Sequence, residues 1–277
     1  MSRFIYADHA GTTALSQTAL AAMTPYFTEQ YGNPSSLYRF GQEAKADLER
    51  ARADIAACIG AKPEEIFFTS GGTEADNWAL KGVVELMALK GKTTGHIITS
   101  AIEHHALLHT AQHLEKQGYA VTYLPVDELG RVSPADVEAA IRPDTVLISI
   151  MAANNEIGTI QPVAEIGAVA RRHKILFHTD AVQAVGHIPV DVEAWNVDLL
   201  SLSAHKFQGP KGVGALYVRR PLRLPPLLHG GGQEKGRRSG TENVPGAVGM
   251  AAALKEAVDH LPEESARLAA LRDKLIA

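Results

Sequence analysis

The sequence predicts an α/β domain in which helices cover a mostly parallel sheet of seven strands. Two observations support this prediction. Short apolar runs alternate with helical stretches from residue 66 onward, and polar or glycine-rich residues follow most of these runs. The composition, 45% hydrophobic and 21% charged over 277 residues, is that of a globular chain long enough to bury a large core.

Two helices are expected before the first strand. One covers residues 14–31 and ends at a turn, residues 32–36, whose proline and asparagine favour non-helical backbone. The other begins at about Gln42 and carries apolar residues at three- and four-residue spacing until it ends before Gly60. Its apolar stripe includes Cys58, which we interpret as a core residue because no nearby charge favours its thiolate.

The remaining elements alternate along the chain. The apolar runs expected as strands are residues 66–69, 96–100, 120–124, 145–150, 175–179, 198–202 and 213–218. Helices fit between most of them, at residues 74–89, 104–117, 134–141 and 163–173. A helical pattern resumes at Pro245 and still continues over residues 264–277.

Charge and composition exclude several classes of function. The net charge is −4 and the basic residues are scattered, so we expect no nucleic-acid partner. A single cysteine allows neither an intramolecular disulfide nor a thiolate zinc cluster. At the N-terminus, polar Asp8 and His9 occur before a signal-like apolar core could form. No apolar run in the sequence approaches the about 18 residues of a membrane span. We therefore expect a soluble cytoplasmic protein with no membrane contact.

Polar side chains gather where the expected strands end. These clusters are residues 70–73, Glu103 with His104, Asn154 with Asn155, Asp180, and residues 203–206. In a sheet of parallel strands, ligands bind beyond the carboxyl ends of the strands. The clusters therefore predict one site at this edge of the sheet.

The residue types in these clusters fit pyridoxal phosphate. That cofactor needs a lysine for a Schiff base, an acid at the pyridine nitrogen, a donor to the ring oxygen and a phosphate cradle. Lys206 supplies the amine, and Asp180 would hold the ring nitrogen protonated. Gln183 lies within one helical turn of Asp180 and could reach the ring oxygen. A lone lysine is usually a solvated surface charge, so the prediction depends on these neighbours.

The phosphate would be held where a glycine turn opens a helix. Residues 71–73 (GGT) directly follow a strand, and free backbone N–H groups at the positive end of a helix dipole favour a phosphate. Ser203 and His205 could add donors to the same phosphate. His104 could lie flat over the ring as a stacking partner and proton carrier.

Two other features have simple alternative interpretations. His105, His109 and His113 recur every four residues, a geometry that could bind a metal, but no carboxylate beyond Glu115 joins them. We interpret them as a solvated polar face and predict no metal site. Residues 229–241 are glycine-rich and basic, which fits either a flexible surface loop or a functional one.

Five motifs together resemble those of the cysteine desulfurases, which belong to the class V aminotransferase group of fold-type I pyridoxal phosphate enzymes. The motifs are residues 69–77 (TSGGTEADN), 154–159 (NNEIGT), 178–183 (HTDAVQ), 203–206 (SAHK) and 238–241 (RSGT). The resemblance extends from about Tyr6 to the last residue. It implies a homodimer that takes sulfur from L-cysteine and leaves L-alanine. A persulfide would then pass to a sulfur-acceptor or iron–sulfur scaffold protein, for iron–sulfur cluster or thiolated-cofactor synthesis.

The resemblance also implies roles for single residues. Lys206 and His104 would be catalytic, Lys206 as the Schiff-base lysine and His104 as the stacking and proton-carrying group. The cofactor-binding residues would be Thr73, Asn155, Asp180, Gln183, Ser203, His205, Lys206 and Thr241. Among them, Thr241 would arrive from the partner subunit, and Asn155 would contact both cofactor and substrate.

The chain departs from the family pattern in three places. Residues 8–13 (DHAGTT) carry His-Ala-Gly where the family has Asn-Ala-Ala, and Tyr38 stands where a histidine is common. We expect these two changes to reshape only the substrate pocket. The chain also ends before the family's nucleophilic cysteine and the arginine that binds the substrate carboxylate. We therefore expect a fragment: an N-terminal segment (1–15), the pyridoxal phosphate large domain (16–250) and the start of a truncated C-terminal domain (251–277).

Other interpretations of the function remain open at this point. The same cofactor site could serve a selenocysteine lyase, a β-elimination or a transamination, because the fold does not fix the chemistry. A chain without the thiol domain could also be a scaffold that binds the cofactor or a partner without turnover.

Overall fold

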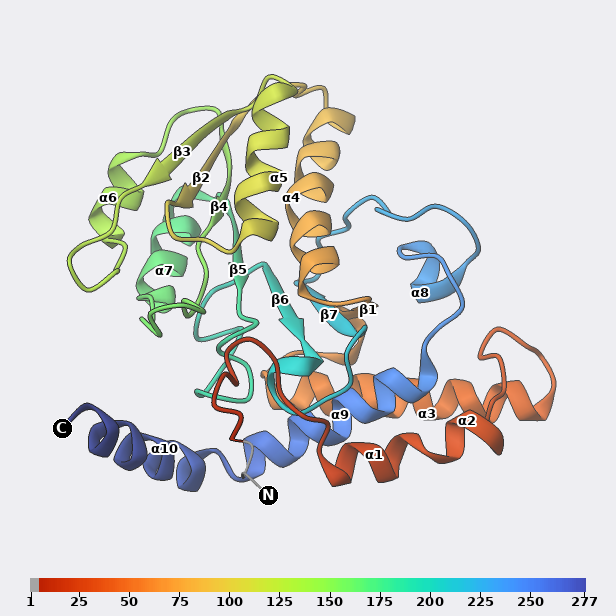
Figure 1. Cartoon of the computed structure of the whole chain (residues 1–277). Coiled ribbons are helices and arrows are strands. Elements are labelled where there is room, and N and C mark those ends of the chain that lie inside the picture. The colour runs from red at the N-terminus through yellow and green to blue at the C-terminus, as the bar shows by residue number, and fades with distance from the viewer. Residues whose placement is uncertain (1–4) are drawn as a thin grey trace.

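A computed structural model describes residues 5–277, and its centre is one seven-stranded sheet (Figure 1). Across the sheet the strands are ordered β1 (Ile66–Thr69), β7 (Gly214–Val218), β6 (Leu199–Ser203), β5 (Leu176–Asp180), β4 (Thr145–Ser149), β2 (His96–Ser100) and β3 (Ala120–Leu124). The strands from β6 to β3 are parallel to one another, and β7 is antiparallel to both β1 and β6. The predicted α/β class and the mostly parallel sheet are confirmed.

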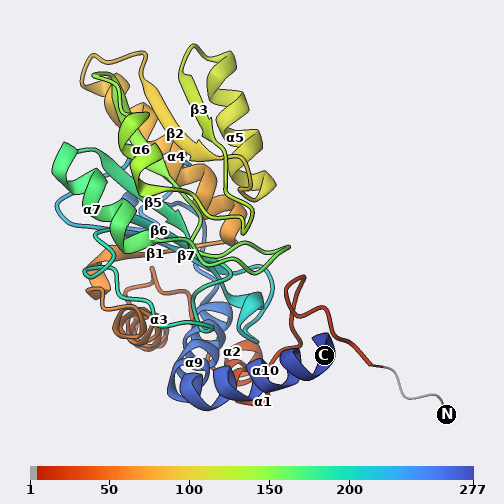
Figure 2. The same ribbon diagram turned by 90° about the vertical axis from the view of Figure 1, so that its left-hand side faces the viewer.

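Helices cover both faces of the sheet. Figure 2 shows α5 (His105–Lys116) on one side, with α6 (Pro134–Ala139) and α7 (Val163–His173) on the other. The helix α4 (Gly72–Leu89) shares the α5 face. Side chains alternate across each strand, so apolar positions of one strand enter two cores. In β6, for example, Leu199 packs toward α4, whereas Leu200 packs into the larger core on the other face.

A second group of helices packs into the larger core, the same one that Leu200 enters. It contains α1 (Gln17–Met23), α2 (Pro25–Thr28), α3 (Arg39–Cys58) and α9 (Val244–Asp259), and α9 packs against both α1 and α3. The short helices are η1 (Pro63–Glu65), η2 (Ala204–Lys206) and α8 (Gln233–Gly236), and the chain ends in α10 (Leu261–Ile276). Every residue of α10 is at least partly exposed, so this helix adds no buried residue to the core.

One predicted helix is wrong. Residues 14–31 do not form a single helix: α1 begins after Ser16, whose hydroxyl accepts from the N–H of Ala19 at 3.0 Å, and it ends at Met23. Pro25 then opens the separate helix α2. Proline has no N–H to donate within a helix but fits a first helical position, which explains the break here. The other predicted helices and strands lie within about one turn of the observed bounds.

The predicted division of the chain stays a prediction. Of the segment 1–15, residues 1–4 lie outside the described residues. The proposed boundary after residue 250 falls inside α9, where Ala253 and Leu254 are buried in the same core as α3. Within residues 5–277, no helix combines the length and apolar character needed to cross a membrane.

Candidate active site

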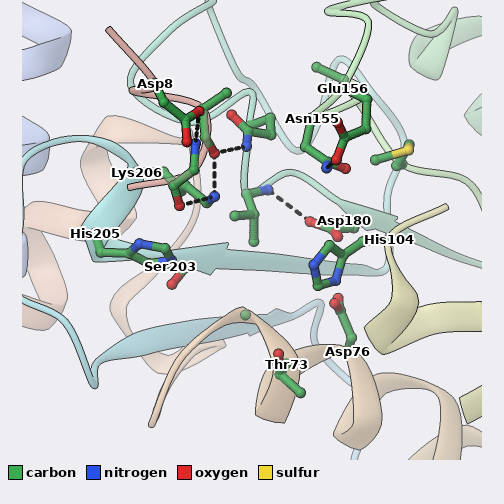
Figure 3. A pocket seen from close by; sticks show the side chains of 17 residues that line it. Asp8, Thr73, Asp76, His104, Asn155, Glu156, Asp180, Ser203, His205 and Lys206 are labelled. Atoms are coloured by element: carbon green, nitrogen blue, oxygen red, sulfur yellow. Dashed lines mark hydrogen bonds between the residues drawn. The ribbon is translucent and has the colours of Figure 1, made fainter. Parts of the chain in front are cut away.

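The predicted site residues gather around one cavity of about 500 Å³ (Figure 3). It lies where β5 and β6 end and α4 and α5 begin, which is the carboxyl edge of the parallel strands. Eight predicted residues line it: Thr73, His104, Asn155, Asp180, Gln183, Ser203, His205 and Lys206. The ninth, Thr241, is exposed on the glycine-rich loop and is not among the lining residues.

Lys206 reaches the cavity from η2, the short turn that directly follows β6. Its Nζ donates to the backbone carbonyl oxygens of Ala10 at 2.5 Å and Gly11 at 2.8 Å, so the N-terminal segment lies against the amine. Partial burial lowers the pKa of Lys206 from its usual value, while the carboxylates of Asp180, Asp8 and Glu156 act in the opposite direction. A lowered pKa favours the neutral amine that nucleophilic attack requires.

Asp180 is the last residue of β5 and is buried. Its Oδ1 accepts from the backbone N–H of Val182 at 2.9 Å. Burial raises the pKa of Asp180, whereas the nearby His104 and Lys206 lower it. A carboxylate in such a place is stabilised by a cation in the cavity, and a protonated ring nitrogen is one such cation.

A buried polar row, not predicted from the sequence, lies on the α4 face of the sheet next to Asp180. His178 of β5 hydrogen-bonds with Ser149 Oγ of β4 at 2.9 Å and with Ser201 Oγ of β6 at 3.0 Å. Its Nε2 also lies 3.7 Å from Oδ1 of Asp76 on α4. Burial lowers the pKa of His178 to about 3, so the imidazole is neutral at ordinary pH.

Asp76 is a lining residue to which the sequence assigns no role. It is 1% exposed, yet it borders the cavity, and its Oδ1 has no hydrogen-bond partner among the described residues. Burial and the negative charge of Asp180 raise the pKa of Asp76. In the sequence, the only indication of a role for Asp76 is its position inside the motif at residues 69–77. Its place in a helix gives no sign that its side chain borders the cavity.

The turn at the start of α4 is shaped to let a ligand approach the backbone. Gly71, the N-cap, has a φ of 149°, a backbone angle that residues with a side chain rarely adopt. A Cβ on Gly214 of β7 would lie 2.7 Å from Gly71 Cα and 2.5 Å from the carbonyl oxygen of Leu202. The N–H groups of the first helical turn have no intrahelical partner, so this turn is a natural anion site. A second cavity of about 420 Å³ shares Thr73 and Ser203 with the first and also reaches this turn.

Three further predicted residues approach the cavity from separate elements. His104 is the N-cap of α5, and its Nδ1 accepts from the N–H of Ala106 at 3.1 Å, which leaves Nε2 free to face the cavity. The side-chain amide of Gln183 donates to Ala10 O at 2.9 Å. Asn155 is half-buried and donates to the carboxylate of Glu156 at 2.8 Å. In Figure 3, His104 lies near Asp180 and Asp76, and Lys206 lies on the opposite side of the cavity.

His205 hydrogen-bonds with the N-terminal segment next to the start of α4. The Nδ1 of His205 hydrogen-bonds with Thr12 Oγ1 at 3.0 Å, and Thr13 Oγ1 donates to His205 O at 2.8 Å. Burial lowers the pKa of His205, helped by the positive charges of Lys206 and Lys211. A neutral His205 still donates one hydrogen bond, so it can contact an anion in this part of the cavity.

The sequence similarity to known proteins extends over nearly the whole chain. Residues 5–271 match the family model described as aminotransferase class-V. Cysteine desulfurase IscS of Methanosarcina thermophila is 56% identical over 99% of this chain and 67% of its own length. Cysteine desulfurase IscS of Clostridium botulinum strain Hall is 53% identical over 100% of this chain and 69% of its own length.

Solved structures of similar proteins align with most of this chain. A NifS-like protein aligns with a TM-score of 0.95 at 46% identity, over 98% of this chain and 74% of that one. SspA in complex with cysteine aligns with a TM-score of 0.87 at 45% identity, over 93% of this chain and 73% of that one.

The chain belongs to the class-V aminotransferase family and has the fold of the fold-type I enzymes that use pyridoxal phosphate. Within that family it is a cysteine desulfurase, as the predicted resemblance indicated. The chain spans about two thirds of the length of the two curated relatives.

The residues present fit this cofactor. A buried carboxyl, Asp180, has one oxygen left for a ring nitrogen, and the turn at Gly71 and Gly72 leaves space that side chains would fill. A Cβ on Gly72 would lie 2.7 Å from Cγ2 of Val182, itself a lining residue of the larger cavity. The amine, the acid and the anion site therefore meet in one cavity.

Proposed function

We propose that the cavity holds pyridoxal phosphate covalently on Lys206 and that L-cysteine bound there gives up its sulfur and leaves as L-alanine. The observation that carries this proposal is that Lys206, Asp180 and the glycine turn before α4 face the same cavity. Similarity to SspA in complex with cysteine supports the choice of substrate. When bound, the cofactor supplies an electron sink for the substrate carbanion.

Each lining residue then has a defined task. Asp180 would keep a negative charge beside the ring nitrogen, and Gln183 could donate to the ring oxygen, since both line the cavity. His104 would stack on the ring and could carry protons through Nε2, because its Nδ1 accepts from the N–H of Ala106. Asn155, which also lines the cavity, would contact both cofactor and substrate.

The phosphate is held by the glycine turn and by three side chains of this chain. These are Thr73, Ser203 and His205, which all border both cavities near the start of α4. We place Thr241 on the phosphate of a second copy in a homodimer, since in its own subunit it does not line the cavity. Its exposure on the loop supports this placement.

The sulfur leaves as a persulfide on a thiol. In that step a thiolate would attack the substrate sulfur, so that an S–S bond forms while the C–S bond breaks, and the electron pair of the C–S bond would stay on the carbon, which is protonated to give L-alanine. Cys58 is a poor candidate for this thiol: it packs against the core, it does not line the cavity, and burial raises its pKa to about 11. We propose that residues 1–277 alone form little protein-bound persulfide, and that a cytoplasmic sulfur acceptor such as an iron–sulfur scaffold protein is the downstream partner.

Spectroscopy and product analysis test the proposal together. The purified chain should develop a visible absorption band when titrated with pyridoxal phosphate, and with L-cysteine and excess dithiothreitol it should yield L-alanine rather than pyruvate. Lys206→Ala should lose the band, whereas Lys255→Ala, an exposed lysine on α9, should keep it. A chain that forms no band, or one whose band survives Lys206→Ala, contradicts the proposal.

A further inference from the structure

One ion pair joins the glycine-rich loop to the turn that opens α4. Arg238 Nε donates to Glu74 Oε1 at 2.7 Å, and Arg238 Nη2 donates to Glu74 Oε2 at 3.0 Å. The same Oε2 accepts from the backbone N–H of Ser70 at 2.7 Å. The Glu74 carboxylate therefore bridges the loop and the first residue of the turn, and its side chain is only 11% exposed.

Glu74 lies at a position where its negative charge opposes the binding of a phosphate. It is the third residue of α4, in the turn whose N–H groups face the proposed phosphate, and it lines the smaller cavity with Thr73 and Ser203. Burial alone would raise the pKa of Glu74, but its hydrogen bonds with Arg238 and Ser70 hold that pKa below its usual value. Glu74 is therefore ionised, and a carboxylate and a phosphate that close repel each other unless a cation lies between or beside them.

Arg238 is well placed to be that cation because its loop is fixed. Glu234, in the same loop, is buried and forms a bidentate ion pair with Arg52 of α3 at 2.8 and 2.7 Å. It also accepts from the N–H of Phe68 in β1 at 3.0 Å. Glu234 and Lys235 have φ values of 48° and 60°, the left-handed region, which this anchoring stabilises. The loop is thus held against β1 and α3 rather than being a loose surface connection.

We propose that Arg238 is a positioning residue for the cofactor phosphate: by pairing with Glu74 it cancels a charge that opposes the phosphate and keeps the Ser70 turn in its binding shape. Arg238 lines neither of the two cavities at the turn, so it acts through Glu74 and not by direct contact. The inference rests on the proposed function, because it requires the phosphate of pyridoxal phosphate to lie at the start of α4.

The test compares ligands that differ only in the phosphate. The dissociation constants of pyridoxal phosphate and of pyridoxal are measured on cofactor-free chain by fluorescence titration. Arg238→Met is expected to weaken pyridoxal phosphate about tenfold, because it leaves Glu74 as an uncompensated charge beside the phosphate. Pyridoxal, which has no phosphate, is expected to bind within about twofold of the unchanged chain.

A charge-cancelling double variant separates electrostatics from simple loss of structure. Glu74→Gln combined with Arg238→Met removes both charges while the amide oxygen can still accept from Ser70 N–H, so affinity for pyridoxal phosphate should return to within about threefold of the starting value. Arg267→Met is the matched control, since it breaks an exposed ion pair with Glu264 on α10. If Arg238→Met does not fold, Arg238→Lys should still show a partial, phosphate-specific loss, because lysine keeps the charge but not the two-pronged geometry.

Three results overturn the inference: an unchanged affinity of Arg238→Met for pyridoxal phosphate, an equal loss for both ligands, or no recovery in the double variant. Failure of the proposed function is seen separately, as the absence of any band that depends on Lys206 in the unchanged chain. In that event, binding of inorganic phosphate to the unchanged chain and to Arg238→Met still tests the role of Arg238, with equal binding contradicting it.

Discussion

Ser100 and Glu103 form a short hydrogen bond, with 2.6 Å between Ser100 Oγ and Glu103 Oε1. The same carboxylate oxygen accepts from the N–H of Met151, a residue that lines the cavity, at 3.0 Å. Glu103 Oε2 is buried and has no partner among residues 5–277. This carboxyl group therefore joins the end of β2 to the loop after β4, and its ionisation has a cost in stability.

The pH dependence of unfolding should reveal Glu103. Burial raises its pKa to about 8, so the stability linked to its protonated form is complete below its unfolded value near 4.5 and is lost as the pH rises through about 8. Glu103→Gln keeps an acceptor for Ser100 and Met151 and removes the ionisation. Urea unfolding from pH 5 to 9 should show the variant gaining stability over the unchanged chain, by on the order of 1 kcal/mol per pH unit between about pH 5 and pH 8, with the difference levelling off above pH 8.

Glu29→Gln, at an exposed carboxylate in the N-terminal part of the chain, is the control and should leave the pH dependence unchanged. A Glu103→Gln variant whose stability runs parallel to that of the unchanged chain at every pH would show that Glu103 does not titrate in this range.

Gly214 should tolerate no side chain. Its Cβ would meet the carbonyl oxygen of Leu202 at 2.5 Å and the Cα of Gly71 at 2.7 Å, and both are backbone atoms that cannot move aside cheaply. Gly214→Ala should lower the free energy of unfolding by about 1–3 kcal/mol. It should also weaken pyridoxal phosphate binding by displacing the turn at Gly71. Gly232→Ala, at a glycine with negative φ and open space around it, should change neither quantity, and equal effects of the two substitutions would refute this account.

The ion pair of Arg52 with Glu234 should be costly to break from one side. Both side chains are nearly inaccessible, at 3% and 2% exposure, so Arg52→Met strands a buried carboxylate and should cost about 3–5 kcal/mol in urea unfolding. Replacing both residues, as Arg52→Met with Glu234→Leu, should cost less than Arg52→Met alone. Arg39→Met removes an exposed partner of Glu43 and should cause no measurable change. A double variant that is less stable than Arg52→Met would contradict the reasoning.

Cys58 should behave as an inert thiol. Because burial raises its pKa to about 11, its thiolate fraction at pH 8 should be about a hundredfold below that of free cysteine, with a correspondingly slow reaction with iodoacetamide. The alkylation rate should keep rising up to pH 10, while that of free cysteine levels off earlier. Cys58→Ser should leave L-alanine formation unchanged. Rapid alkylation at pH 8, or a persulfide found on Cys58 after incubation with L-cysteine, would contradict this prediction.

The sheet and most of the cavity could be predicted because they depend on local pattern. Apolar runs rich in β-branched residues placed all seven strands within about one residue of their observed bounds. The rule that ligands bind beyond the carboxyl ends of parallel strands then brought His104, Asp180 and Lys206 together. The single helix expected over residues 14–31 is wrong because Pro25, which has no N–H to donate to the preceding turn, begins the separate helix α2.

Relationships between residues far apart in the sequence could not be predicted. The pairing of Arg52 with Glu234 spans 182 residues, and nothing in a basic, glycine-rich stretch indicates that one glutamate in it is buried. The row formed by His178 with Ser149 and Ser201 depends on strand register, which periodicity alone does not fix. Asp76 was visible in its motif, but only the packing of α4 on β5 and β6 shows that it borders the cavity.

The most direct test of the central claim is chemical mapping of the lysine that carries the cofactor. The chain is incubated with pyridoxal phosphate, reduced with borohydride and digested, and the modified peptide is identified by mass spectrometry. A single pyridoxyl group on Lys206 is the predicted result, and it should be absent from Lys206→Ala. A label on another lysine such as Lys211, or none on Lys206 after saturation, would contradict the assignment of this cavity as the cofactor site.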